Sequence, residues 1–259
     1  MFSRRQFLGL TGVGALALTG CVGPSPIDPP SRRSRRCAGR DEMTAHETVG
    51  GVPLVYEENG RAQAFAFEEG FHGQLDAWFG TWQARTGLTA GSIRTYGAWI
   101  DGGADCGTSW HHAGRAFDIA GINNGDQVVV SCREDTWREF SETNRAEHRR
   151  RYWMLAASLH LHFAYVLTYL YDGAHANHIH IDNGVSGSGM SSFRTRSRVQ
   201  NQAVQAICRY LWGVPCEITG DWDRQTRRAS EAVLEQLGAG GALTRGENWA
   251  VFLDGSIAR

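Results

Sequence analysis

The spacing of apolar positions predicts two long helices. Between residues 68 and 86, apolar residues recur every three or four positions, as on one face of a helix, and Gly87 follows as a stop signal. Residues 134–163 are also mostly helical in pattern, and their second half is apolar. We interpret the apolar residues of the first helix as core: Phe71, Leu75, Trp78, Phe79 and Trp82.

Shorter segments between and after these helices have the pattern of β-strands. Residues 92–100 look extended, and residues 128–132 are mostly β-branched. Residues 164–171 and 178–182 form a predicted strand pair joined by a turn at Asp172 and Gly173. The chain is therefore predicted to be an α+β protein, with a small antiparallel sheet flanked by helices.

The composition changes after Gly184. Residues 186–192 are rich in glycine and serine, and a compact helical segment rich in tryptophan and arginine follows. We place a domain boundary here, so that residues 46–192 form the main domain and residues 193–259 a small helical domain. With 259 residues, 42% of them hydrophobic, the chain is long enough for each to have a core.

The first residues resemble a bacterial lipoprotein export signal. Arg4 and Arg5 precede a short apolar run, as in a twin-arginine signal, and this run is too short to cross a bilayer. Residues 18–21 resemble a lipobox, in which Cys21 would be lipidated; the alternative is an ordinary signal peptide with a chance cysteine. Residues 1–21 are thus a predicted signal, and residues 22–45, with prolines and a run of arginines, a tether. The expected location is the cell envelope, lipid-anchored on the outer face of the cytoplasmic membrane or in the periplasm.

Export also bears on the cysteines, because disulfides persist outside the cytoplasm. The natural local pairs are Cys106 with Cys132 and Cys208 with Cys216. Cys37, in the predicted tether, is then left free.

Histidine and aspartate in the middle of the chain form half of a predicted zinc site. Catalytic zinc takes three protein ligands and keeps a fourth position for water. His111 and Asp118 are seven residues apart, too far to share one ion on a continuous helix or strand. They can do so only if the chain folds back between them, and Gly114 permits such a bend.

The other half of this site is expected on the strand at residues 178–182. Successive side chains of a strand point to opposite faces, so His178 and His180 share one face while the two isoleucines face the core. His175 lies just before the strand and can reach the same pocket.

Together these residues resemble a known zinc signature. It is shared by D-Ala-D-Ala carboxypeptidases, murein endopeptidases and the hedgehog signalling domain. Within that superfamily, residues 114–119 and 177–182 are most similar to the bacterial extensin-like C-terminal domain, and the resemblance covers roughly residues 65–185. The positions that carry it are Ser109, His111, Gly114, Ala116, Asp118, His178 and His180.

The resemblance implies a role for each side chain near the metal. His111, Asp118 and His180 would bind zinc, and His178 would stabilise an oxyanion beside it. These families usually place a carboxylate, as general base, a few residues before the last ligand. Here His175 holds that place, and this departs from the commoner pattern.

Three upstream residues are implied in substrate binding. Arg94 and Tyr96 lie where related enzymes place a substrate-binding arginine, and Arg94 would also help to stabilise the oxyanion. Ser109 resembles the serine that helps to hold substrate.

The remaining histidines are interpreted as structural. His112 would point away from the metal if its segment is extended, and His160 and His162 end an apolar helix. Residues 218–229 loosely resemble the turn and following helix of a peptidoglycan-binding domain. The alternative is a helical cap that merely packs on the main domain.

These expectations combine into a zinc metallopeptidase that hydrolyses peptidoglycan peptide bonds, as a carboxypeptidase or an endopeptidase. The alternative hypothesis is a non-catalytic zinc-containing cell-wall-binding module, which the missing acidic base favours. A third is a different hydrolase that uses the same metal site. Expected partners are a peptidoglycan peptide and, through the lipid anchor, the membrane. The formal net charge of -1 gives no electrostatic basis for binding nucleic acid.

Overall fold

The structure is a computed structural model that describes residues 37–102, 108–184 and 186–259. Over these residues the chain has an α+β fold, which confirms the predicted class. The predicted export signal, the predicted lipidation site Cys21 and most of the predicted tether lie outside the described residues. No helix in the described part of the chain is long and apolar enough to span a membrane.

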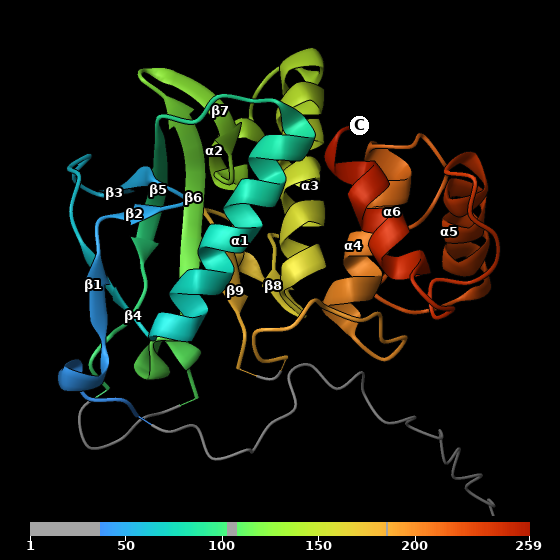
Figure 1. Ribbon diagram of the computed structural model, residues 1–259. Helices are drawn as coiled ribbons and strands as arrows, with labels where there is room; N and C mark the ends of the chain where they lie inside the picture. The colour runs from blue at the N-terminus through green and yellow to red at the C-terminus, as the bar shows by residue number, and fades with distance from the viewer. Residues whose placement is uncertain (1–36, 103–107, 185) are drawn as a thin grey trace, which may run out of the picture.

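A seven-stranded sheet forms the centre of the fold (Figure 1). The order of its main path is β2-β3-β5-β6-β9-β8, and β7 pairs with β6 off this path. The pairs are antiparallel except for β3 with β5, so the sheet is larger than predicted and mixed. Its strands are β2 (Thr48–Val49), β3 (Val52–Tyr56), β5 (Ser92–Gly97), β6 (Ala116–Asn124), β7 (Gln127–Ser131), β8 (Tyr165–Leu167) and β9 (Ile179–Asp182).

Two long helices, α1 (Glu69–Thr86) and α3 (Glu142–His162), cover one face of this sheet (Figure 1). The Glu68 carboxylate caps α1 by accepting hydrogen bonds from the backbone N–H groups of Gly70 and Phe71. Gly87 ends the helix in the left-handed conformation, with φ of 64°. The predicted first helix and its apolar core residues are therefore confirmed.

The second predicted helix is divided in two. A short α2 (Glu134–Trp137) precedes α3, and Ser141 is the N-cap residue at which α3 begins. A small two-stranded sheet of β1 (Thr44–His46) and β4 (Phe65–Phe67) lies beside the main sheet, near the beginning of α1.

The connection between β8 and β9 differs from the predicted tight turn. β8 ends at Leu167, and a 3-10 helix, η3 (Gly173–His175), lies between the two strands. The Asp172 carboxylate accepts hydrogen bonds from the backbone N–H groups of Ala174 and His175. Asp172 therefore caps a helical turn and does not form a two-residue hairpin, because its side chain satisfies the backbone locally.

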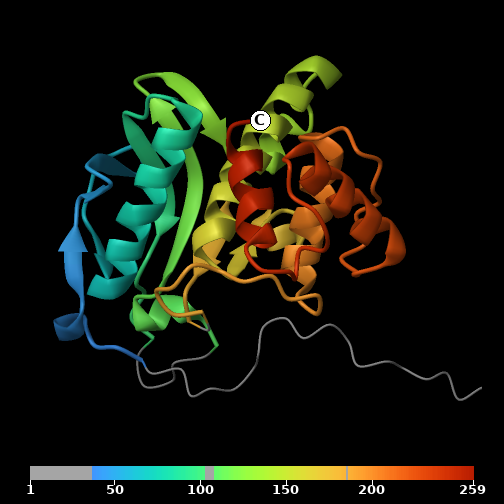
Figure 2. The ribbon, with the colours of Figure 1, turned by 45° about the vertical axis from the view of Figure 1, so that its right-hand side comes forward.

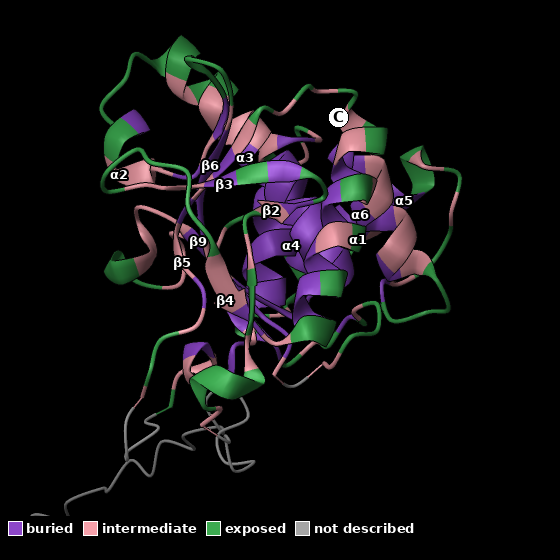
Figure 3. Ribbon diagram, turned by 60° about the vertical axis from the view of Figure 1, so that its left-hand side comes forward, coloured by how far each residue is buried: buried purple, intermediate pink, exposed green. Residues whose placement is uncertain are grey.

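The C-terminal residues form three helices, α4 (Arg198–Tyr210), α5 (Arg224–Gln236) and α6 (Asn248–Ile257). Figure 2 shows α6 packed against α3, and the core cluster includes residues from both helices. Nearly all of α4 is buried (Figure 3). Helix α3 is thus covered on one side by the sheet and on the other by the C-terminal helices. The division at residue 192 stays a prediction.

The predicted cysteine pairing is wrong. Cys132, Cys208 and Cys216 are free thiols, whereas Cys37 is disulfide-bonded. Cys132 is fully buried and its thiol interacts with the backbone of Ile179, so it points into the core. The Cys216 thiol donates to the Glu217 carbonyl at 3.8 Å. Cys106 lies outside the described residues.

His160 is a buried polar residue on α3. Its side chain is 0% exposed, and neither ring nitrogen has a hydrogen-bond partner in the described structure. The ring of Trp249 on α6 lies 6.2 Å away, centroid to centroid. Burial lowers the pKa of His160 to about 3, so this side chain is neutral in the folded protein at ordinary pH.

Replacing His160 with leucine should make the protein less sensitive to acid. Between the folded pKa of about 3 and the unfolded value of about 6.5, the unfolded chain binds the extra proton, so stability falls as the pH falls. From pH 7.5 to pH 5, His160 should therefore remove about 2 kcal/mol from the free energy of unfolding of the natural protein. Urea unfolding of the natural protein and of His160→Leu at both pH values measures this loss. The same change in the free energy of unfolding in both proteins would contradict the prediction.

Candidate metal centre

Three elements bring the predicted zinc ligands together. Asp118 lies on β6 and His180 on β9, directly opposite each other in the antiparallel register. His111 lies on η2 (Trp110–Ala113), a short 3-10 helix that precedes β6. Ligands separated by up to 69 residues in the chain therefore meet at one point.

The chain folds back between His111 and Asp118 at Gly114, as predicted. Gly114 has φ of 66°, in the left-handed region that favours glycine, and its N–H bonds to the carbonyls of Trp110 and His111. A Cβ at this position would lie 2.2 Å from Sδ of Met43 and 2.8 Å from the backbone N of Glu68. Both the conformation and the packing therefore require glycine here.

The three side chains present their ligand atoms to one another. Nε2 of His111 is 3.2 Å from Asp118 Oδ2 and 3.2 Å from His180 Nδ1. His180 Nδ1 is 2.8 Å from Asp118 Oδ1. A tetrahedral zinc with bonds of about 2.0–2.1 Å separates its ligand atoms by about 3.3 Å. The cluster thus has the composition of three zinc ligands, and one ligand atom from each side chain lies within 4.8 Å of the other two.

The opposite ring nitrogens of both histidines have acceptors of their own. Nδ1 of His111 donates to the backbone carbonyl of Ala98. Nε2 of His180 lies 3.6 Å from Asp182 Oδ2, and Asp182 is itself held by the backbone N–H of Gly184. Such partners set which nitrogen faces a metal. No local pattern assigns this role to Asp182, because its place at the end of a strand also suits a capping residue.

The Asp118 carboxylate pairs with both histidines of the cluster and holds them together. Burial alone would raise the pKa of Asp118, but hydrogen bonds with His111 and His180 hold it well below its usual range. Burial acts to lower the pKa of His180, but Asp118 and Asp182 outweigh it and raise that pKa to about 9. Asp118 is therefore ionised, and it would supply a negative charge to a cation bound at this cluster.

Replacing Asp182 with asparagine should weaken zinc binding without removing a ligand. The amide oxygen can still accept from Gly184, but the negative charge that supports His180 is lost. Loss of such a partner typically lowers metal affinity about 10–100-fold. Competition with a coloured zinc chelator measures the change, and an unchanged affinity would show that Asp182 does not support the ligand.

His175 and His178 lie beside the three ligands. Nδ1 of His175 is 2.6 Å from Asp172 Oδ1, and its ring centroid is 5.1 Å from that of His178 and 6.1 Å from that of His180. His178 Nε2 is 3.6 Å from Asp118 Oδ1, and burial lowers the pKa of His178 to about 4. The structure thus brings the predicted base and the predicted oxyanion residue to the cluster.

The predicted substrate residues are placed differently from one another. Tyr96 contacts His178, with ring centroids 5.8 Å apart, and so borders the site. Arg94 forms an ion pair with Glu57, whose other carboxylate oxygen pairs with Arg133 at 3.1 Å. A pairing with Glu57 could not be foreseen from the sequence, because the two residues meet only through the β3–β5 register.

Ser109 and the other histidines have structural contacts. The Ser109 hydroxyl caps η2 by accepting from the His111 N–H at 3.3 Å. Nδ1 of His112 lies 2.9 Å from the Ile100 carbonyl, and His162 Nε2 lies 3.1 Å from the Thr81 hydroxyl. Neither belongs to the ligand cluster, in agreement with the prediction.

A comparison with protein families agrees with the resemblance read from the motifs. Residues 98–192 match the extensin-like protein C-terminus. This extensin-like segment contains all three ligands, together with Asp172, His175, His178 and Asp182. It ends at residue 192, where we place the predicted domain boundary. No curated protein and no solved structure was found to match the chain.

Proposed function

We propose that this protein is a zinc metallopeptidase of the cell envelope that hydrolyses peptide bonds of peptidoglycan. The observation that supports it best is that a cluster of three candidate ligands lies next to a pair of residues suited to acid–base catalysis. His111, Asp118 and His180 converge as a set of three ligands, and the Asp172–His175 pair lies beside them. Three protein ligands with an adjacent acid–base group are typical of hydrolytic zinc sites.

Zinc, when bound by these residues, would lower the pKa of a water molecule toward 7 and polarise a scissile carbonyl. His175 would receive the proton of the attacking water. Its Nδ1 is occupied by Asp172 at 2.6 Å, so Nε2 is the atom available for this transfer. His175 would then return the proton to the leaving amine.

The remaining side chains would position the substrate. His178 stays a prediction as the residue that stabilises the carbonyl oxygen, because its Nδ1 faces the Asn177 side-chain oxygen at 2.7 Å and a neutral ring then carries no proton on Nε2. Tyr96, beside His178, would line the path of the peptide. Arg94 and Ser109, which have partners inside the protein, stay predictions as substrate contacts.

The predicted export signal and lipidation site support a location in the cell envelope. A twin-arginine signal and lipidation at Cys21 would hold the protein in the envelope, where peptidoglycan is the abundant peptide-bearing polymer. The loose likeness of residues 218–229 to a peptidoglycan-binding domain supports the same substrate. A zinc-containing wall-binding module without turnover is the competing proposal.

The test is incubation of purified, zinc-loaded protein with a mixture of muropeptides, followed by mass spectrometry. We expect shortened peptides or separated cross-links that are absent after zinc is removed with a chelator. Binding of muropeptides without any new product would favour the non-catalytic module.

A further inference from the structure

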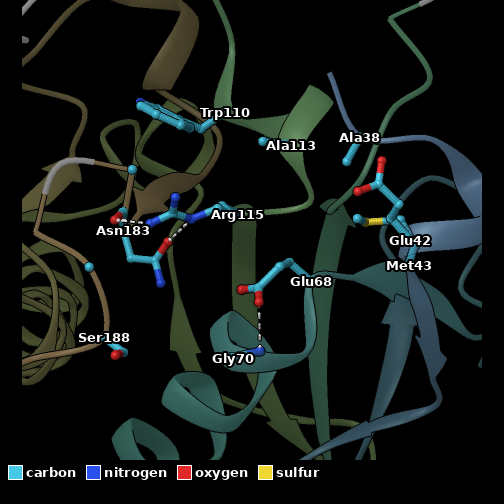
Figure 4. Close-up of a pocket in the computed structure, with 12 residues that line it drawn as sticks. Ala38, Glu42, Met43, Glu68, Gly70, Trp110, Ala113, Arg115, Asn183 and Ser188 are labelled. Atoms are coloured by element: carbon cyan, nitrogen blue, oxygen red, sulfur yellow. Dashed lines mark hydrogen bonds between the residues drawn. The ribbon is translucent and has the colours of Figure 1, made fainter. Parts of the chain in front are cut away.

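A pocket lies at the end of the sheet, next to the metal centre but apart from it. It has a volume of about 610 Å³, which is the size of a small-molecule site. Figure 4 shows it bounded by the beginning of α1, η2, the segment after β9 and the N-terminal segment before β1. The residues that line it include Glu42, Glu68, Trp110, Arg115, Asn183 and Gly184. We refer to it as the Arg115 pocket.

The pocket and the metal centre lie on different sides of the same structural elements. Arg115 is three residues before Asp118, and Asn183 is three residues after His180, so this pair is about 10 Å along the two strands from the ligands. An offset of three also turns the side chains toward the opposite face of a sheet. Within η2, His111 belongs to the metal cluster whereas Trp110 lines the pocket. A ligand here would therefore not occupy the metal site.

Arg115 is held in a fixed orientation at the pocket. Its Nε donates to Asn183 Oδ1 and its Nη2 to the Asn183 carbonyl, each at 2.8 Å (Figure 4). Cζ of Arg115 lies 5.3 Å from the centroid of the Trp110 ring, within reach of a cation–π interaction. Trp110 is in turn fixed by Gly184, where a Cβ would lie 1.9 Å from the indole.

The charge of Arg115 has no acidic partner among the residues that the structure describes. Both of its acceptors belong to Asn183 and are neutral, and Nη1 makes no hydrogen bond there. By contrast, Arg94 and Arg133 are both paired with carboxylates. An oriented guanidinium with a nitrogen left over is suited to a carboxylate ligand, which it binds through charge-assisted hydrogen bonds.

Carboxylates line the other walls of the pocket. Glu68 lies at the beginning of α1 and Glu42 on the N-terminal segment, across the pocket from Arg115 (Figure 4). Glu68 uses its oxygens to cap the helix, and the exposed Glu42 accepts a hydrogen bond from the Gly39 N–H at 3.1 Å. The pocket thus separates one positive wall from negative ones, which suits a ligand that carries both charges.

We propose that the Arg115 pocket binds a short peptide or amino acid through its free carboxylate at Arg115 and its free ammonium group at the Glu42 side. This site is independent of the proposed hydrolysis, since no ligand of the metal cluster lines it. Trp110 provides an apolar surface for the side chains of such a ligand.

The experiment is calorimetric titration of the full chain with three related probes: the dipeptide Ala-Ala, its N-acetyl derivative and its C-terminal amide. Ala-Ala should bind best. The amide should bind about 10–100-fold more weakly, because it lacks the charge that Arg115 recognises. The N-acetyl form should also lose affinity, by about tenfold, because it lacks the ammonium group.

Two substitutions assign the contacts. Arg115→Met keeps the apolar stem and should abolish the preference for Ala-Ala over its amide, whereas Arg138→Met, at an exposed ion pair elsewhere, should not. Glu42→Gln keeps an oxygen for the Gly39 N–H and should abolish only the preference for a free amine. Because Glu42 is exposed, this second variant keeps the test valid if Arg115→Met does not fold.

Titration after zinc removal distinguishes this site from the metal centre. Unchanged affinity for Ala-Ala supports the Arg115 pocket, whether or not the protein proves to be a peptidase. Three results would each overturn the proposal. They are no binding of Ala-Ala by the natural protein, binding of Ala-Ala that is no better than that of its amide, and loss of Ala-Ala binding when zinc is removed.

Discussion

Replacing His175 with alanine should lower the turnover of a susceptible muropeptide by about 10²–10⁴-fold while zinc stays bound. His175 is not part of the ligand cluster, and its Nδ1 is engaged by Asp172. The variant would therefore lose the group proposed to move the proton but none of the atoms proposed to hold the metal. Initial rates by liquid chromatography and zinc content by elemental analysis measure the two effects separately.

Asp172→Asn is the matched variant for this prediction. It keeps an oxygen that can cap η3 but removes the charge that orients and supports His175. We expect a smaller loss of turnover than in His175→Ala, and little further loss when the two are combined, because both act on one proton transfer. Turnover like that of the natural protein in His175→Ala would remove this residue from the mechanism.

Zinc content should fall from about one equivalent to near zero when Asp118 is replaced by alanine. Asp118 is the only ligand of the three that carries a negative charge, and it contacts both His111 and His180. Removing it leaves two neutral ligands, which are too few for a stable site in a chelating buffer. Elemental analysis after dialysis against a weak chelator measures the content.

His112→Ala is the control for zinc content. His112 is adjacent to a ligand in the chain, but its ring nitrogen faces the Ile100 carbonyl. This variant should keep its zinc. Full zinc retention in Asp118→Ala, with the fold checked by circular dichroism, would show that the metal is held elsewhere or not at all.

The sequence predicted those features that depend on local pattern. Helix α1 followed from the spacing of its aromatic residues, and the bend between His111 and Asp118 followed from the single glycine that allows it. The shared face of His178 and His180 followed from strand alternation. The motif that contains the three candidate ligands is short and specific, and the structure brings these side chains together.

Features that depend on tertiary contacts were not predicted. The pairing of Arg94 with Glu57 requires the parallel register of β3 and β5, which no local pattern encodes. The partnership of Asp172 with His175 was missed because an Asp-Gly pair between two strands usually indicates a tight hairpin. The cysteine pairs were assigned by nearness in sequence, but the Cys132 side chain points into the core.

The placement of α1 and of the C-terminal helices bears on how this protein can be divided. The extensin-like segment begins at residue 98, after α1 and β5, and ends before α4. Cut out at those limits, it would lose β5, which pairs with β6, and the helices α1, α4 and α6, which pack against α3. An unpaired strand edge and a bare apolar helix favour self-association. The segment that carries the proposed metal site is thus not a portable module, and grafting or minimising the protein has to keep the flanking elements that complete its core.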